Sequence, residues 1–101
     1  MTAFATTLSA NADALQTTVS GPTWIHLDNG ATFNGGTVAL KFIGDDGKPH
    51  AMQDSTGTVI AYAAGADDFY DFPAQTNITL TMQGAAGATS VYVQVRTEPR
   101  R

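Results

Sequence analysis

Alternation of apolar and polar side chains is the feature of this sequence that most restricts its fold. Val38, Leu40 and Phe42 alternate with Thr, Ala and Lys side chains. The same period of two leaves Gln94 and Arg96 outward and turns one set of apolar side chains inward in residues 77–83 and 90–96: Ile78, Leu80, Met82, Val91, Val93 and Val95. This period is typical of a β-strand with one buried face. Strands are therefore expected in six segments: residues 14–20, 23–28, 37–43, 58–63, 77–83 and 90–96. Three further candidates are residues 4–9, 49–53 and 68–72.

Clusters that combine glycine with Asp, Asn or Ser separate these segments. They occupy residues 28–36, 44–48, 54–57, 63–68 and 83–90. Glycine adopts positive φ without strain, and the polar residues bond their own backbone, so both favour tight turns. The pattern predicts an all-β fold: an antiparallel β-sandwich, jelly-roll or immunoglobulin-like, with about seven or eight short strands and little or no helix. We expect an N-terminal arm at residues 1–12 and a single domain at residues 13–101.

The balance of charges argues against nucleic acid as a partner. The chain of 101 residues has a formal net charge of −4 and only five Lys and Arg, whereas binding a phosphate backbone requires a basic surface. The absence of cysteine excludes a disulfide, a thiolate metal site and a cysteine nucleophile. The start lacks the pattern of a signal peptide, and no run of about 18 apolar residues occurs. A soluble chain made in a cytoplasm, with no membrane partner, is expected.

Asp45 and Asp46 directly follow an expected strand and lie between Gly44 and Gly47. A hairpin turn explains them, because an Asp-Gly pair accepts positive φ and a carboxylate caps the turn by accepting backbone N–H bonds. A calcium loop would need oxygen ligands spaced over about a dozen residues and a final bidentate carboxylate. The sequence that follows does not reproduce that spacing, so we predict a turn and no metal.

A second acidic cluster, Asp67, Asp68 and Asp71, is interleaved with aromatic residues. Alternation places Phe69 and Asp71 on one side and Asp68 on the other, which favours an irregular edge strand kept from pairing by its charges. A carboxylate pair for glycoside hydrolysis is the alternative, but sequence spacing does not set the separation that this chemistry requires. No catalytic residue is assigned, and the chain is not expected to be an enzyme.

His26 and His50 are the only histidines, too few and too isolated to indicate a zinc site. His26 shares a strand face with Trp24 and Asp28. A partly buried imidazole paired with a nearby acid is therefore favoured over a general base, for which no nucleophile is evident. Trp24 is expected in the core, although an aromatic side chain also suits a sugar-stacking surface or an interface. No cofactor is predicted.

Several stretches of the chain resemble small virion proteins of tailed bacteriophages. They are WIHLD, FNGGTVALKF, DDGK, FPAQT and ITLTMQGAAGATSVYVQV, all within residues 24–95. The resemblance implies a β-sandwich that decorates the exterior of a phage head and stabilises it as a cement protein, with the major capsid protein as partner. It implies a virion location after synthesis in the host cytoplasm, and it transfers no catalytic residue. Since exposed sandwich edges favour association and the family is often oligomeric, a homo-trimer is expected.

The contact with the partner is expected at Phe4, Thr6, Leu8, Trp24, His26 and Tyr70. The arm is included because a weakly patterned segment gains order best against a partner. Two alternatives remain open. One is a fibre or neck connector component of the virion. The other is a carbohydrate-binding module, which would need at least two coplanar exposed aromatic rings from among Trp24, Tyr62, Tyr70 and Tyr92.

Overall fold

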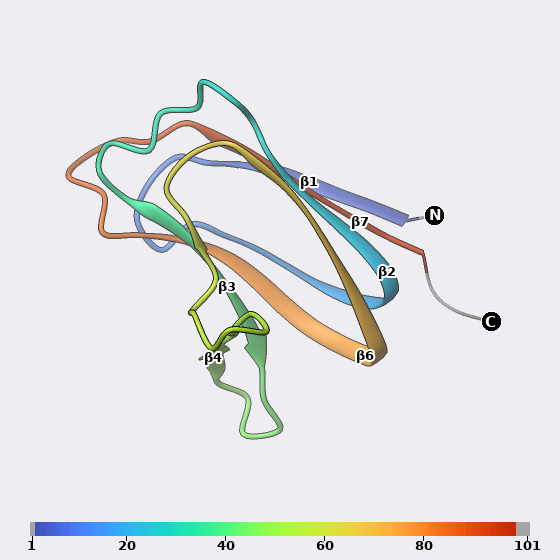
Figure 1. Ribbon diagram of the computed structural model, residues 1–101. Helices are drawn as coiled ribbons and strands as arrows, with labels where there is room; N and C mark the ends of the chain where they lie inside the picture. The colour runs from blue at the N-terminus through green and yellow to red at the C-terminus, as the bar shows by residue number, and fades with distance from the viewer. Residues whose placement is uncertain (1, 99–101) are drawn as a thin grey trace.

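The computed structural model describes residues 2–98, which form an all-β fold with antiparallel strand pairing throughout (Figure 1). The seven strands are β1 (Thr2–Leu8), β2 (Ala14–Leu27), β3 (Thr37–Ile43), β4 (Pro49–Ala51), β5 (Ala61–Tyr62), β6 (Ala66–Gln83) and β7 (Val91–Thr97). They form one sheet in the order β1-β7-β2-β6-β3-β4, and β5 pairs with β3. The predicted fold class and number of strands are confirmed. Within these residues no helix is long and apolar enough to cross a membrane.

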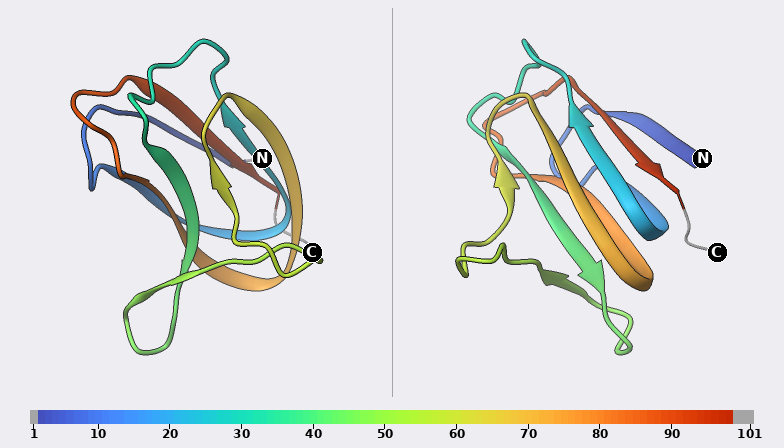
Figure 2. Two further views of the ribbon diagram at one scale, coloured as in Figure 1. Left: turned by 60° about the vertical axis from the view of Figure 1, so that its left-hand side comes forward. Right: turned by 45° about the vertical axis from the view of Figure 1, so that its right-hand side comes forward.

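Two long strands, β2 and β6, pair with each other along almost their whole length. Leu27 faces Ala66 at one end of the pair, and Ala14 faces Thr81 at the other. The register shifts after Val19, and the next paired residue, Gly21, has a φ of 69°. Glycine tolerates this positive φ best, and a bulge increases the local bend of a strand. Both strands turn back sharply in this region (Figures 1 and 2).

The bend divides the sheet into two layers, which gives the fold its sandwich-like form. The first layer contains β1, β7, residues 21–27 of β2 and residues 66–72 of β6. The second layer contains residues 14–19 of β2, residues 76–83 of β6, and β3 with the short strands β4 and β5. Figure 2 shows the two halves of β2 and β6 lying in different layers.

Apolar side chains from both layers fill the space between them. In the second layer Leu15, Leu80 and Leu40 lie side by side on three neighbouring strands, and Leu40 and Leu80 are fully buried. Alternate valines of β7 are buried in the first layer. The inward faces predicted for β3, β6 and β7 are thus confirmed, except that Phe42, at the end of β3, is 37% exposed.

The prediction of uniformly short strands was wrong for β2 and β6. Segments 14–20 and 23–28 are one strand, and segments 68–72 and 77–83 are another. Because a bulge disturbs the pairing only locally, Gly21 and Pro73, which lie in the gaps between the predicted segments, are within continuous strands. In contrast, segment 58–63 keeps only the two residues of β5, since the Asp54 carboxylate accepts bonds from the backbone N–H groups of Thr56 and Thr58 and holds a loop there.

Candidate functional site

The outward face of the first layer brings together side chains that are far apart in the sequence. On β2, Trp24 lies between Arg96 of β7 and Phe69 of β6 in the strand register. Two residues further along β2, His26 lies between Gln94 and Asp67 in the same way. We refer to these six residues as the outer-face cluster: Trp24, His26, Asp67, Phe69, Gln94 and Arg96. Five of them, all except Phe69, line a shallow depression of about 480 Å³.

Trp24 lies on this outward face and is 39% exposed, so its prediction as a core residue was wrong. The alternation of side chains along β2 explains why Trp24 is exposed. Thr23, Ile25 and Leu27 are buried, and the alternation of a strand then turns their neighbours outward. The assignment of His26 and Trp24 to one face of the strand is confirmed.

Trp24 and Phe69 form an exposed aromatic pair. Their ring centroids are 5.3 Å apart and their planes are inclined by 60°, an edge-to-face arrangement. Phe69 is 52% exposed. Such pairs are more favourable than their buried area alone suggests. The rings therefore support each other in a fixed position while both remain accessible from outside.

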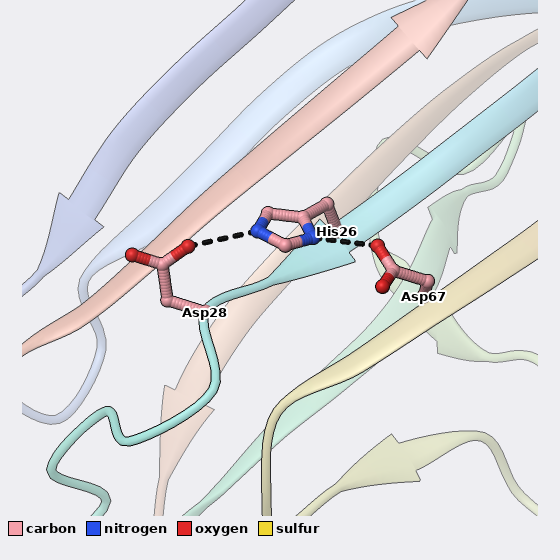
Figure 3. Close-up of polar contacts among 3 residues, drawn as sticks. All are labelled: His26, Asp28 and Asp67. Atoms are coloured by element: carbon pink, nitrogen blue, oxygen red, sulfur yellow. Dashed lines mark hydrogen bonds and ion pairs between the residues drawn. The ribbon is translucent and has the colours of Figure 1, made fainter.

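His26 links two carboxylates across the edge of this surface (Figure 3). Its Nδ1 lies 2.5 Å from an oxygen of Asp67, and its Nε2 lies 2.8 Å from an oxygen of Asp28. An ionised carboxylate only accepts hydrogen bonds, and a neutral imidazole donates only one. Both contacts can therefore be hydrogen bonds only when both ring nitrogens of His26 have a proton, that is, when the imidazole is positively charged. In agreement, the bond to Asp67, followed by that to Asp28, raises the pKa of His26 above its ordinary value of 6.5.

We expect the Asp67→Asn substitution to lower the pKa of His26 more than Asp28→Asn does, because Asp67 contributes most to the rise. Because the pKa of His26 is raised by folding, its hydrogen bonds to the two carboxylates stabilise the folded state fully below about pH 6.5. This stabilisation is lost as the pH rises through the pKa that His26 has in the folded protein. The effect on unfolding should be small, because the His26 side chain is 40% exposed. An NMR titration of the imidazole protons measures each pKa. Equal pKa values in the parent and both variants would contradict the double bridge.

The acidic cluster is divided between the two faces of β6. Asp67, Phe69 and Asp71 are exposed, whereas Asp68 and Tyr70 are half-buried on the other side. The predicted division of side chains and the edge position are confirmed, because within the described part of the chain residues 66–72 pair with β2 and with no other strand. The strand is regular rather than irregular, with no register shift in this part.

Tyr70 lies outside the outer-face cluster, in a part-buried network with Tyr62 and Asp68. The Asp68 carboxylate accepts bonds from the hydroxyls of Tyr62 at 2.6 Å and Tyr70 at 3.1 Å, and the two hydroxyls are 3.1 Å apart. Burial, then these bonds, raises the pKa of Tyr62 far above its ordinary value. Burial also raises the pKa of Tyr70, so both tyrosines remain protonated donors that attach the β5 segment to β6.

The three candidate contacts near the N-terminus lie on β1, which pairs with β7 from Thr2 to Leu8. Leu8 is only 1% exposed and belongs to the core. Phe4 and Thr6 are half-buried. Since Leu8 is enclosed by the fold itself, a partner on this strand would meet Phe4 and Thr6 instead.

The turn predicted at residues 44–48 is confirmed. Gly47 has a φ of 77°, its N–H donates to the Gly44 carbonyl, and the Asp46 carboxylate accepts a bond from the Lys48 N–H at 3.0 Å. That backbone bond, followed by the bond to His50, lowers the pKa of Asp46. Between residues 2 and 98 no group of three or more His, Asp or Glu side chains is placed to hold a metal ion.

Comparison with protein-family models, curated proteins and solved structures found no match to this chain.

Sequence reasoning did not identify Phe69, Gln94 and Arg96 as partners of Trp24 and His26. Alternation assigned Gln94 and Arg96 to the outward side of their strand, and Phe69 to the side of Asp71. Placing them around Trp24 also requires the order and register of β6, β2 and β7. These pairings join distant segments and leave no local signal in the sequence.

Proposed function

We propose that this protein is a structural virion protein without catalytic activity, which binds the exterior of a tailed-phage head and stabilises it. The major capsid protein is the partner in this proposal, and the outer-face cluster is the contact surface. The exposed pair Trp24 and Phe69, held on a rigid sheet, is the observation that carries the binding function. The resemblance described above supplies the class of partner.

The composition of the outer-face cluster suits a protein–protein contact. Interfaces are enriched in aromatic residues and arginine, and a few such residues near the centre dominate the binding energy. Here two aromatic rings are surrounded by the charged or polar side chains of His26, Asp67 and Arg96. A partner that covers the rings would thus contact both an acidic side chain, Asp67, and basic side chains, His26 and Arg96, around them.

The rigidity of the surface also suits attachment to a lattice. The cluster lies on three neighbouring strands that are joined by backbone hydrogen bonds, and His26 ties the edge strand β6 to β2. A surface that is already ordered loses little conformational entropy on binding. Many identical contacts on one particle would then convert a modest affinity into durable attachment.

Co-sedimentation with expanded phage capsids assembled without this protein tests the proposal. We expect binding that saturates at an integer ratio to the major capsid protein and that raises the temperature at which the capsid disassembles. Absence from the pellet at saturating concentration would reject a role in decorating the head. It would leave a fibre or neck connector component, which purified tails or necks in the same assay would detect.

A carbohydrate-binding module is the second candidate function. The depression in the outer-face cluster favours it, because Trp24 lies there beside Asp67, Gln94 and Arg96, which can bond sugar hydroxyls. The 60° angle between Trp24 and Phe69 argues against the flat platform of two coplanar rings expected for this function. A glycan array separates the candidates: binding that is lost in Trp24→Ala supports the module, and an array without hits removes it.

A further inference from the structure

One side of the molecule consists of two open strand edges. Among residues 2–98, the strand β1 of the first layer pairs with β7 alone. In the second layer, residues 14–19 of β2 pair with no described strand except β6. A short turn at residues 9–13 connects the two strands, and β1 and β2 contact each other (Figure 2). Along each edge, the backbone N–H and C=O groups that point away from the sheet have no neighbouring strand to pair with.

Within residues 2–8 and 14–19, neither edge has the features that normally prevent a strand from pairing with another chain, although a bulge follows the second edge after Val19. Residues 2–8 read TAFATTL and residues 14–19 read ALQTTV, without a charge or a proline. The pairing of β1 with β7 also contains no bulge. Natural edge strands are commonly protected by charged residues, proline, bulges or short length. This side of the sandwich is therefore open to a further strand.

The opposite side of the molecule has that protection. The edge formed by residues 66–72 of β6 contains Asp67, Asp68 and Asp71, and Pro73 follows it. The edge strand β4 has three residues and begins with Pro49, and β5 has only two. The contrast between the two sides makes the open side the one that is available for pairing with a further strand.

The side chains along the open side suit contact with an identical surface. Phe4 and Leu15 are half-buried there, so each exposes apolar area, and Leu15 packs at the margin of the core. Ala3, Ala5 and Thr7 are small and exposed on the outward face of β1. The nearby Asp13 carboxylate accepts bonds from the Ser9 and Ala10 N–H groups at 2.8 and 3.2 Å, so it is engaged within its own turn.

We propose that β1 pairs with β1 of a second copy of this chain, antiparallel and across a two-fold axis. Antiparallel pairing of identical strands is self-complementary, so one surface serves both copies and the contact closes at two subunits. The first layer would continue from one subunit into the next, and the contact would cover Phe4 and Leu15. This inference does not depend on capsid binding, and it replaces the threefold assembly expected from the sequence with a dimer.

Sedimentation velocity on the full chain over a range of concentrations tests the assembly. We expect a dimer that dissociates on dilution. Ala5→Lys should raise the dimer dissociation constant about fivefold or more, because like charges face each other across the paired strands. Gln83→Lys is the matched control, since it adds the same charge at the exposed end of β6. Mixing Ala5→Lys with Ala5→Glu should restore the dimer, which would also show that both variants fold.

Cysteine cross-linking identifies the strand, because the natural chain has no cysteine. In antiparallel self-pairing, a residue on the axis faces its own copy, and residues equally far from the axis face each other. Ala5→Cys should form a disulfide-linked dimer if the axis passes there, and a mixture of Ala3→Cys with Thr7→Cys should do the same. The proposal would be overturned by a protein that is monomeric at every concentration or that forms a trimer. It would also be overturned by a dimer that is neither weakened by Ala5→Lys nor cross-linked through β1.

Discussion

Under the proposed role in decorating phage heads, replacing Trp24 with alanine is expected to weaken binding to capsids by about 30-fold or more, corresponding to about 2 kcal/mol. Trp24 occupies the middle of a row between Arg96 and Phe69, and it lines the depression of the outer-face cluster. Its loss removes the largest ring of the surface and leaves Phe69 without its edge-to-face partner. Quantitative co-sedimentation of the variant with capsids measures the change.

Val59→Ala is the matched control for this substitution. Val59 is an apolar residue that is 50% exposed, and it lies in the loop before β5 rather than in the outer-face cluster. Its binding should equal that of the parent protein. Thermal unfolding of Trp24→Ala must show that the variant is folded. Unchanged capsid binding by folded Trp24→Ala would show that another surface makes the contact.

Replacing Leu80 with alanine is expected to lower the free energy of unfolding by about 2–5 kcal/mol, the range for large-to-small changes in a packed core. Leu80 is fully buried and lies between Leu15 and Leu40 in the second layer. Its truncation leaves a cavity beside both neighbours, which are held by the backbone pairing of three strands. The core can therefore close only partly around the gap. Denaturant unfolding followed by fluorescence and circular dichroism measures the loss.

Gln83→Ala provides the comparison for Leu80→Ala on the same strand. Gln83 is exposed at the end of β6, so its substitution should change the free energy of unfolding by about 0.5 kcal/mol or less. A similar small effect for Leu80→Ala would mean that the two layers are not packed together at this position.

The sequence predicts most strands of this fold well because each of them, unlike the fully exposed β4, has one face in the core. Leu40, Leu80 and Val93 show the period of two directly, and the structure buries all three. The same signal does not reveal that β2 and β6 pass from one layer to the other. Gly21 and Pro73 both suggest chain breaks, yet the backbone continues through them as one strand. At each of these residues the chain could end one strand in a turn or bend within a single strand. The pairing of β2 with β6, which are far apart in the sequence, decides for the bend.

The candidate site was predictable only in part, for a related reason. The pairing of His26 with Asp28 follows from their positions two residues apart on one strand face. The second bond, to Asp67, depends on the register of β2 against β6. Trp24 was misplaced because a large aromatic residue is more often buried, whereas the buried positions of this strand are taken by Thr23, Ile25 and Leu27.

The continuous pairing of β2 with β6 has a consequence for the order in which the protein forms during its synthesis. Every residue pair of this ladder, from Leu27 with Ala66 to Ala14 with Thr81, joins segments separated by β3, β4 and β5. Neither layer can therefore be completed while the ribosome is still adding residues before Gln83. Distant pairing of this kind is slow to form, and the uncharged strand β1 waits longest, because its partner β7 is made after the other six described strands. The nascent chain thus carries an unpaired, association-prone segment until β7 emerges, and binding of that segment by a chaperone would protect it.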